Sequence, residues 1–505
     1  MRRLAILRSL VVGLSALSLG GCAGGGGSPS SPSSSGPQTV SARSASDQRA
    51  GDENHPKILA QYGGEVQDRN LRDYVNGVGR RLAAQSEQPS ARWTFTVLDS
   101  PVVNAFALPG GYVYVTRGLI ALCNDEAELA GVIGHEIGHV TAAHSAQRQE
   151  QASIAQLGAL GATIIGAVAG LSGPALDSIS QLGSTVGQGY VASYSRSQEL
   201  EADRLGVRYI ARSGYDPRAQ ADFLANMQAE TQLQSRAAGN AYNPNRVDFF
   251  STHPATAERV REAISAAGAE SAGAAAPRER DQFLSAISGM IYGDSPAQGF
   301  VEGRRFSHSE LRFTFAAPQA FQIRNAAAQV TMVGPEGAGI IFDGDTNRAA
   351  SMEQYIASVW APALARQARA GQVQDMRRQN IGGLEAASAL MPVQTKAGVR
   401  VLRMTAIRDG DKVWRFLGVQ PQGAVSLGAR MDQAAASFAK LSAAEARRLS
   451  PQRIGIHTVR AGETPASLAR LSAFTDNAEQ RFRVLNGLGP REGLKPGQKV
   501  KLIQR

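Results

Sequence analysis

The chain has few cysteines, few histidines and no long run of basic residues. Among its 505 residues are 2 cysteines and 7 histidines. Two cysteines exclude the disulfide framework on which many small secreted domains depend. The formal net charge is +10, yet no run of Lys and Arg is long enough for a nucleic-acid surface. We therefore expect no nucleic-acid partner, and the excess charge favours anionic lipid or cell-wall polymer.

The first residues have the pattern of an export signal. Arginines precede the apolar stretch 10–19, which is too short to cross a bilayer comfortably. A Leu-Gly-Gly sequence then leads to Cys22, which resembles a bacterial lipobox, in which the cysteine is acylated after cleavage. Ala23 follows instead of an aspartate, which favours the outer membrane of a Gram-negative cell. We predict a signal peptide over 1–21 and a periplasmic protein anchored through lipidated Cys22; an ordinary signal peptide with an incidental cysteine is the alternative.

Composition divides the rest of the chain into a tether and three folded parts. Residues 22–50 are rich in Gly, Ser and Pro and predict a flexible tether. The predicted fold class is α+β: a mostly helical domain with a small sheet over 51–270, an α+β domain over 280–450 and a small βααβ unit over 453–505. The weakly apolar stretch 154–171 predicts a buried or cleft-covering helical hairpin, with membrane-surface contact as the alternative.

Periodicity predicts several elements within these domains. Residues 58–84 carry a helical pattern, whereas 93–98 and 112–116 alternate as strands. In the second domain, 399–407 and 413–419 predict a hairpin around an Asp-Gly-Asp turn. This second domain contains no catalytic constellation.

An H-E-x-x-H sequence lies inside an apolar helical pattern. His135 and His139 are four residues apart, so they share one face of a helix and can bind one metal ion, usually Zn²⁺. Glu136 is turned away from that face, where it can reach a water on the metal. Asp125 with Glu128 three residues later predicts the helix start. The bland alternative is a core helix with two satisfied histidines, but burying these groups costs free energy unless each is bonded or metal-bound.

A second acidic helix offers the missing ligand. Glu199 and Asp203 are four residues apart and share a helix face. Glu199 can bind zinc, while Asp203 can accept a hydrogen bond from the second nitrogen of a ligand histidine. Glu201 is expected to face solvent. A charged, exposed helix without a metal role is the alternative.

Four motifs in order resemble metallopeptidase family 48. Around H-E-x-x-H stand N-A-F-A-x-P-G-G beginning at Asn104, S-R-x-x-E-x-x-A-D ending at Asp203, and H-P-x-x-x-x-R from His253 to Arg259. The resemblance is to the HtpX and CaaX prenyl protease type, with its periplasmic lipoprotein branch. It covers about 200 residues and leaves 280–505 uncovered.

The resemblance implies a gluzincin fold and one zinc ion per chain, with Glu136 as the base. The implied ligands are His135, His139 and Glu199. In the periplasmic branch, a histidine matching His253 occupies the fourth zinc position at rest, so the site would be self-inhibited. His253 and Arg259 are the candidate catalytic donors to the oxyanion.

The segment before the metal helix is the candidate substrate-binding strand. An extended substrate could pair with it by β-addition, which gives affinity without sequence specificity. The residues concerned are Asn104, Ala105, Phe106 and Ala107.

The last residues resemble a LysM module, a small βααβ unit that binds N-acetylglucosamine polymers such as peptidoglycan. A V-x-x-G-E-T opening at 459–464, an L-N-G-L sequence at 485–488 and an L-x-x-G-Q-x-V close at 494–500 carry the resemblance. The long segment 475–480 departs from it. Glycan binding and a structural or protein-docking role both stay open.

These features predict a zinc endopeptidase that acts on unfolded or misassembled envelope proteins. The first alternative is a chaperone or assembly factor for outer-membrane proteins with a latent zinc site. The second is an envelope protein that binds peptidoglycan through residues 453–505.

Overall fold

The computed structural model describes residues 45–144, 194–237, 253, 256–270, 276–366, 369–395, 398–474 and 476–505. Cys22 and the stretch 154–171 lie outside the described residues, so the predicted lipid anchor and hairpin rest on the sequence alone. Within the described part, no helix is both long and apolar enough to cross a membrane.

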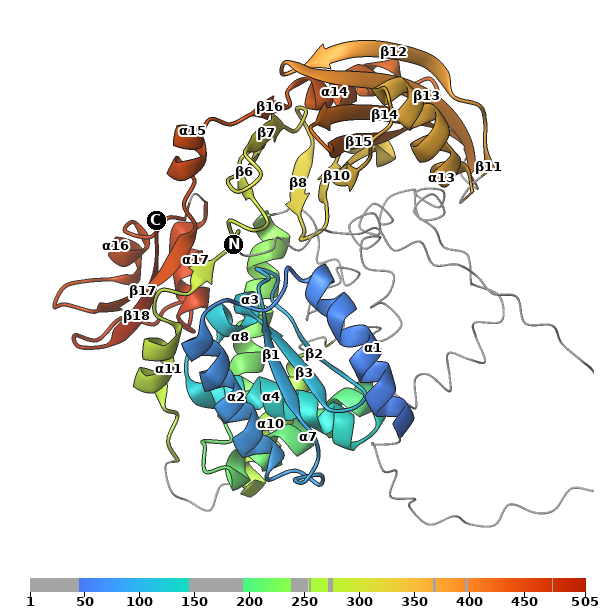
Figure 1. Ribbon diagram of the computed structural model, residues 1–505. Coiled ribbons are helices and arrows are strands. Elements are labelled where there is room, and N and C mark those ends of the chain that lie inside the picture. The colour runs from blue at the N-terminus through green and yellow to red at the C-terminus, as the bar shows by residue number, and fades with distance from the viewer. Residues whose placement is uncertain are drawn as a thin grey trace, which may run out of the picture. The chain divides into compact units, whose positions relative to one another are not determined.

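The amino-terminal region combines helices with a three-stranded sheet (Figure 1). The helices are α1 (Ala45–Gln61), α2 (Arg69–Ala83), α3 (Arg117–Leu122), α4 (Glu126–Thr141), α7 (Arg196–Arg212), α8 (Ala219–Ala237) and α10 (Ala257–Glu270). The strands are β1 (Thr94–Leu98), β2 (Ala105–Leu108) and β3 (Tyr112–Thr116). The middle strand β3 pairs parallel with β1 and antiparallel with β2.

The strand predictions hold, and the helical pattern over 58–84 corresponds to two helices. The alternating segments 93–98 and 112–116 are confirmed as β1 and β3. Helices α1 and α2 cover most of 58–84, with a gap between them. Gly63 and Gly64 both have positive φ in this gap, a conformation that glycine adopts readily and that ends a right-handed helix.

Helix α4 begins where the sequence predicts and is buried almost throughout. The Asp125 carboxylate accepts a hydrogen bond from the Glu128 amide at 2.9 Å, which caps the first turn. Every residue of α4 up to Val140 is buried. The helix therefore carries its polar residues into the interior, where each needs a partner.

Small residues let α4 and α7 cross closely. A Cβ placed on Gly134 would lie 3.3 Å from the Gly206 Cα, and one on Gly206 would lie 3.0 Å from the His135 amide nitrogen. A Cβ on Gly138 would lie 3.1 Å from the Ala202 carbonyl oxygen. This close crossing brings the acidic residues of α7 within reach of the histidines of α4.

The second region is built mainly from antiparallel strands. One sheet has the order β11-β13-β14-β15-β10-β9-β8, with β12 also on β13, and a smaller sheet has the order β16-β7-β6-β5. The larger sheet comprises β8 (Gln322–Asn325), β9 (Val330–Val333), β10 (Gly339–Thr346), β11 (Arg369–Ala370), β12 (Gln374–Ile381), β13 (Leu384–Thr395), β14 (Gly398–Asp409) and β15 (Lys412–Pro421). The smaller sheet comprises β5 (Phe300–Glu302), β6 (Arg305–His308), β7 (Phe313–Ala316) and β16 (Ala439–Lys440). The hairpin predicted around Asp-Gly-Asp is confirmed as β14 and β15.

Short helices accompany these sheets. They are α12 (Met352–Tyr355), α13 (Ala361–Ala365), α14 (Val425–Ala436) and α15 (Ala443–Arg448), with a π-helical turn η5 (Ile356–Trp360) and a 3-10 turn η4 (Pro335–Gly337). Helix α11 (Arg280–Ile287) precedes them in the chain, and its Phe283, Leu284 and Ile287 belong to the hydrophobic core that contains α4. The mixture of helix and sheet in the whole described chain agrees with the predicted α+β class.

The carboxy-terminal segment has the order β17 (Gln452–Thr458), α16 (Pro465–Ala469), α17 (Ala478–Leu485) and β18 (Lys499–Gln504). Strand β4 (Ile291–Tyr292) joins its sheet beside β17. Ile454, Leu485 and Ile503 belong to the same hydrophobic core as residues of α4. Lys501 is fully buried, and its Nζ donates to the carbonyl oxygens of Ala121 at 2.8 Å and Cys123 at 2.6 Å. The segment is thus packed against the start of the metal-motif helix.

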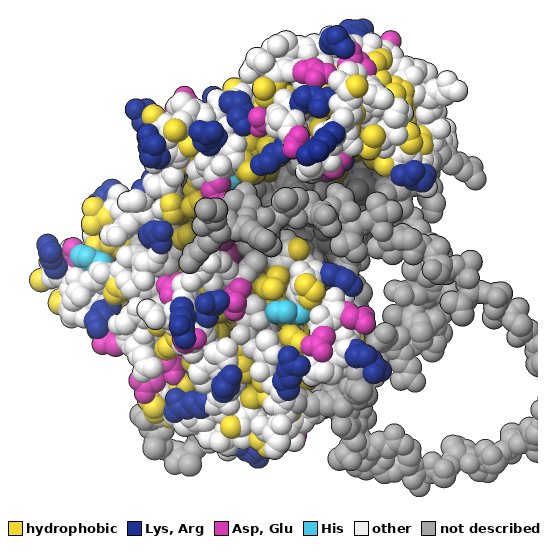
Figure 2. All heavy atoms as spheres, in the orientation of Figure 1, with side chains coloured by type: hydrophobic (Ala, Val, Ile, Leu, Met, Phe, Trp, Pro, Cys, Tyr) yellow, Lys and Arg dark blue, Asp and Glu magenta, His cyan; other side chains and the backbone are white. Residues whose placement is uncertain are grey.

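Charged side chains of both signs occur on the surface. On the face drawn in Figure 2, Lys and Arg side chains lie among Asp and Glu side chains. Exposed pairs such as Arg69 with Asp73 at 3.4 Å and Arg348 with Asp411 at 3.3 Å occur. Because water screens such pairs, each adds little stability.

Candidate metal centre

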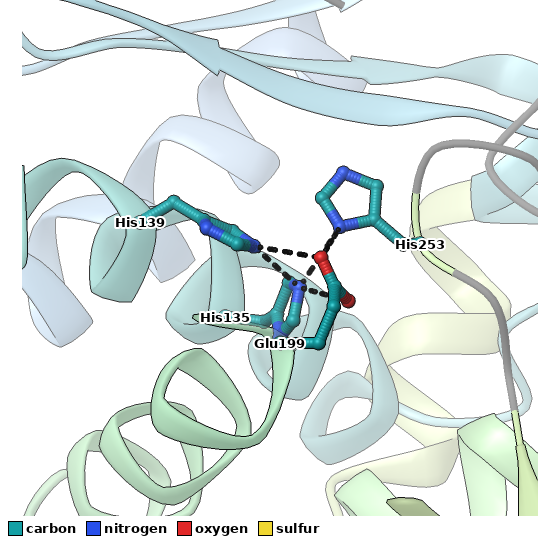
Figure 3. Close-up of side chains that lie close together, drawn as sticks. All are labelled: His135, His139, Glu199 and His253. Carbon is teal, nitrogen blue, oxygen red and sulfur yellow. Dashed lines mark hydrogen bonds and ion pairs between the residues drawn. The ribbon is translucent and has the colours of Figure 1, made fainter. Parts of the chain in front are cut away.

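Four side chains from three parts of the chain converge on one point (Figure 3). They are His135 and His139 from α4, Glu199 from α7, and His253, which lies between α8 and α10. All four are buried, and one ligand atom from each lies within 4.8 Å of the others. The four residues are those that the sequence predicts as metal ligands.

The distances between these atoms fit a tetrahedral ion. His135 Nε2 lies 3.0 Å from His139 Nε2 and 3.2 Å from His253 Nδ1. Glu199 Oε1 lies 2.9 Å from His253 Nδ1 and 3.4 Å from His139 Nε2. Zinc bonds of about 2.0–2.1 Å in tetrahedral geometry separate the ligands by about 3.3 Å. The donor set of three imidazoles and one carboxylate is one that zinc accepts, so the residues present fit the metal.

The outer nitrogen of His135 has an acidic partner. His135 Nδ1 lies 2.9 Å from Asp203 Oδ1. This carboxylate also accepts from Arg259 Nε at 2.7 Å and from Gln220 Nε2 at 3.1 Å. Burial acts to raise the pKa of Asp203, but the Arg259 charge and the hydrogen bonds of Arg259 and His135 hold it below its ordinary value. An ionised Asp203 fixes the His135 tautomer that leaves Nε2 free to bind metal.

Arg259 holds the candidate ligand Glu199 as well as Asp203. Its Nη1 lies 2.7 Å from Glu199 Oε2, and its side chain is buried. Burial opposes ionisation of Glu199, yet the charges of His253 and Arg259 keep its pKa well below the usual range. These contacts favour a positioning role for Arg259 over the predicted role as an oxyanion donor.

Glu136 stands beside the cluster of four side chains. Both of its carboxylate oxygens are buried and make no hydrogen bond to the described residues. His253 lies beside it, with its Nε2 3.8 Å from Glu136 Oε1. Burial raises the pKa of Glu136 above its ordinary value, against the opposing charges of His253 and His135. A buried carboxylate left in this way is a candidate general base.

His139 has neighbours that the sequence interpretation did not include. Its Nδ1 lies 2.9 Å from His144 Nδ1, and its ring stacks on Tyr194 with centroids 3.7 Å apart. His144 Nε2 lies 3.3 Å from Glu201 Oε2. The signal that could have found His144 is a third histidine within ten residues in a chain that has only 7.

The predicted substrate strand lies at the edge of the small sheet. Ala105, Phe106 and Ala107 belong to β2, which pairs with β3 and with no second strand among the described residues. Their side chains and that of Asn104 are buried. Phe106 stacks on Tyr114 with centroids 4.9 Å apart. Pairing of β2 with a substrate stays a prediction.

Comparison with known families bears on this region. The model of Peptidase family M48 matches residues 70–267, and all four converging residues and Glu136 lie within that range. We refer to residues 70–267, which match this model, as the M48 domain. The match and the buried cluster together support a zinc metallopeptidase.

Curated relatives resemble the M48 domain. The beta-barrel assembly-enhancing protease of Escherichia coli is 30% identical over 202 residues, 39% of each chain. The mitochondrial metalloendopeptidase OMA1 of Schizosaccharomyces pombe is 30% identical over 222 residues, 43% of this chain and 59% of its own length. The human mitochondrial metalloendopeptidase OMA1 is 32% identical over 171 residues, 33% of this chain and 31% of its own length. The chain thus spans about two fifths of the bacterial relative and under two thirds of the others.

The similarity to the family model stops at residue 267. The α+β region over 280–450 and the LysM-like segment over 453–505 lie beyond it. Their predicted roles, like the lipoprotein branch, are therefore left to proposal.

Proposed function

We propose that the chain is a zinc metalloendopeptidase of the bacterial periplasm that cleaves unfolded or misassembled envelope proteins. The observation that carries the peptidase activity is the convergence of His135, His139 and Glu199 beside Glu136 within the M48 domain. The bacterial relative's name, which refers to β-barrel assembly, supports the envelope substrates. The export signal over 1–21 and Cys22 support a lipid anchor in the inner leaflet of the outer membrane.

The residues around the centre suit peptide hydrolysis. A zinc ion held there would polarise a water molecule and a peptide carbonyl. Glu136, with its raised pKa and with no hydrogen bond to a described residue, is placed to take a proton and to return it to the leaving amine. His135 and Glu199 are held in position by Asp203 and Arg259.

His253 gives the centre a fourth protein ligand. A catalytic zinc site has three protein ligands and keeps one position open, so four protein ligands describe a resting state. His135, His139 and Glu199 lie on packed helices, whereas His253, between α8 and α10 in the chain, is itself not helical. His253 is therefore the ligand that can withdraw without repacking a helix, and we infer that it must do so before a substrate is cleaved.

The peptidase proposal is tested by Glu136→Gln in the full chain. We expect the variant to bind one zinc ion per chain, because Glu136 is not a ligand, and to lose casein cleavage by at least about a hundredfold. Metal analysis and a fluorescent casein assay give the two readouts. Casein cleavage equal to that of the unaltered protein would remove Glu136 from its role as base.

The resting-state proposal is tested by His253→Ala. If His253 only closes the site and about a tenth of the molecules are open at rest, casein cleavage rises about tenfold in the variant. If His253 instead donates to the oxyanion, cleavage falls. A rate that does not rise would contradict the self-inhibited state.

A chaperone or assembly factor with a latent zinc site is the second candidate. The closed four-ligand arrangement favours it. Rescue of an envelope-stress phenotype by the Glu136→Gln protein would support this function, and failure to rescue would count against it.

Peptidoglycan binding through residues 453–505 is the third candidate. Burial of Lys501 against Ala121 and Cys123 favours a docking role for this segment within the chain. Sedimentation of the full chain with purified peptidoglycan, with and without competing N-acetylglucosamine oligomers, decides between them. Sedimentation that the oligomers abolish would show glycan binding.

A further inference from the structure

The two histidines of α4 are supported from behind in different ways. His135 Nδ1 meets the carboxylate of Asp203, which is buried and bonded to Arg259. His139 Nδ1 meets another imidazole, His144 Nδ1, at 2.9 Å. His144 Nε2 in turn faces Glu201 Oε2 at 3.3 Å. The partners of His135 are all buried. The partners of His139 instead extend to the surface, because the Glu201 side chain is 55% exposed.

The direction of each hydrogen bond in the second support follows from metal binding. If His139 binds zinc through Nε2, its Nδ1 carries the proton and must donate. His144 Nδ1 is then the acceptor, so the neutral His144 ring carries its proton on Nε2. That Nε2–H donates to the Glu201 carboxylate. One acceptor at the surface therefore determines the tautomers of two rings in succession.

Burial makes this arrangement costly unless it has a role. His139 and His144 are both 0% exposed, and an imidazole buried without a partner would lose its hydrogen bonds to water. Tyr194 stacks on His139 and restricts the ring from its flat face. The hydrogen bond that it donates to His144 restricts it from the Nδ1 edge. Together they aim Nε2 at the point where the four ligand atoms meet.

We propose that His144 and Glu201 are positioning residues for His139, acting in series to hold its tautomer and its ring orientation toward the metal. This proposal rests on the proposed zinc binding and extends it to two residues that are not ligands. Glu201 acts only through His144, and His144 acts only through His139. The pair is the counterpart of Asp203 and Arg259 on the other side of the centre.

The test is the zinc dissociation constant of the full chain, measured by competition with a chromophoric chelator. Removal of a hydrogen-bond partner of a ligand histidine typically weakens metal binding about 10- to 100-fold, and we expect this of His144→Ala. Glu201→Ala should weaken binding about fivefold, since Glu201 is exposed and more distant. Glu201→Gln keeps an acceptor oxygen and should stay within about twofold of the unaltered protein.

Action in series gives a further expectation. In a protein that already carries His144→Ala, adding Glu201→Ala should change the dissociation constant no further. The matched control is Arg204→Ala, an exposed residue on the same helix, which should leave zinc binding unaltered. If His144→Ala impairs folding, the contrast between Glu201→Ala and Glu201→Gln decides, because both change a surface side chain.

The possible outcomes distinguish a failure of the positioning proposal from a failure of the proposed zinc site. Zinc binding by His144→Ala as tight as that of the unaltered protein would overturn the positioning role. Equal effects of Glu201→Ala and Glu201→Gln, or independent effects of the two residues, would overturn the series. Failure of the unaltered protein to bind zinc would overturn the metal centre itself.

Discussion

The two ends of helix α4 bury charged groups in opposite ways. At the start, Lys501 donates to two backbone carbonyls, and the Asp125 carboxylate lies 2.9 Å from Arg278 Nε. There, donors meet acceptors. Toward the other end, His135 and His139 present Nε2 atoms 3.0 Å apart, and Glu136 has no hydrogen bond to a described residue. At this end, acceptor atoms converge with their lone pairs directed at one another.

The difference separates structure from function along one helix. Buried donors that meet acceptors recover the free energy of desolvation without further help. Buried acceptors whose lone pairs converge recover the free energy of desolvation only when a cation lies between them. We therefore expect the first cluster to stabilise the protein in any state and the second to do so only with metal.

Removal of zinc should give the largest effect. Chelation should abolish casein cleavage and lower the free energy of unfolding of the M48 domain by about 4 kcal/mol, if free zinc was present at a thousand times its dissociation constant. Thermal unfolding with and without EDTA measures this, and added zinc should reverse it. His135→Ala, which lacks a ligand, should not respond to EDTA. Equal stability of the unaltered protein with and without EDTA would contradict the comparison.

Lys501→Met should give a smaller effect, confined to stability. The carbonyl oxygens of Ala121 and Cys123 would lose their donor, which should cost about 1–3 kcal/mol of unfolding free energy. Denaturant unfolding measures the loss, and the zinc dissociation constant should change less than about twofold. The control is Lys499→Met, two residues away on β18 and 37% exposed, which should cost under about 0.5 kcal/mol. A weaker zinc site in Lys501→Met would show that the two ends are coupled.

The smallest effect, for a change of one pH unit, is a pH dependence at the start of α4. Burial, followed by the Asp125 charge, raises the pKa of Glu128 from 4.5 to about 8. Between these values the native carboxyl holds a proton that the unfolded chain has lost, so its contribution to stability is lost as the pH rises. The amide in Glu128→Gln cannot titrate. As the pH rises, the free energy of unfolding of this variant should therefore increase relative to that of the unaltered protein by about 1 kcal/mol per pH unit. Parallel stability curves from pH 5 to 8 would contradict this.

The sequence predicts those parts of the centre that lie on regular helices. His135 and His139, or Glu199 and Asp203, share a face because helical spacing requires it. His253 lies on no helix, so only the family resemblance indicated it. His144 escapes periodicity because α4 ends at Thr141 and Ala143 has a positive φ of 54°. The chain turns there, and helical spacing no longer indicates where the next side chain points.

Contacts between distant parts of the chain were the least predictable. The sequence predicts a βααβ unit at the carboxy terminus, and the order of β17, α16, α17 and β18 agrees with it. Nothing in its pattern indicates that Lys501 hydrogen-bonds with Cys123, which lies 378 residues earlier in the chain. Similarly, the sequence gives no reason for glycine at positions 134 and 206. The structure gives one, because α4 and α7 cross there so closely that a side chain would not fit.

The coordination of zinc by His253 is the central claim, and X-ray absorption spectroscopy of the zinc-loaded full chain tests it most directly. The spectrum reports the number of imidazoles bound to the metal. We predict three for the unaltered protein, from His135, His139 and His253, and two for His253→Ala. The same number of imidazoles in both proteins would show that His253 is not a ligand at rest and would contradict the account.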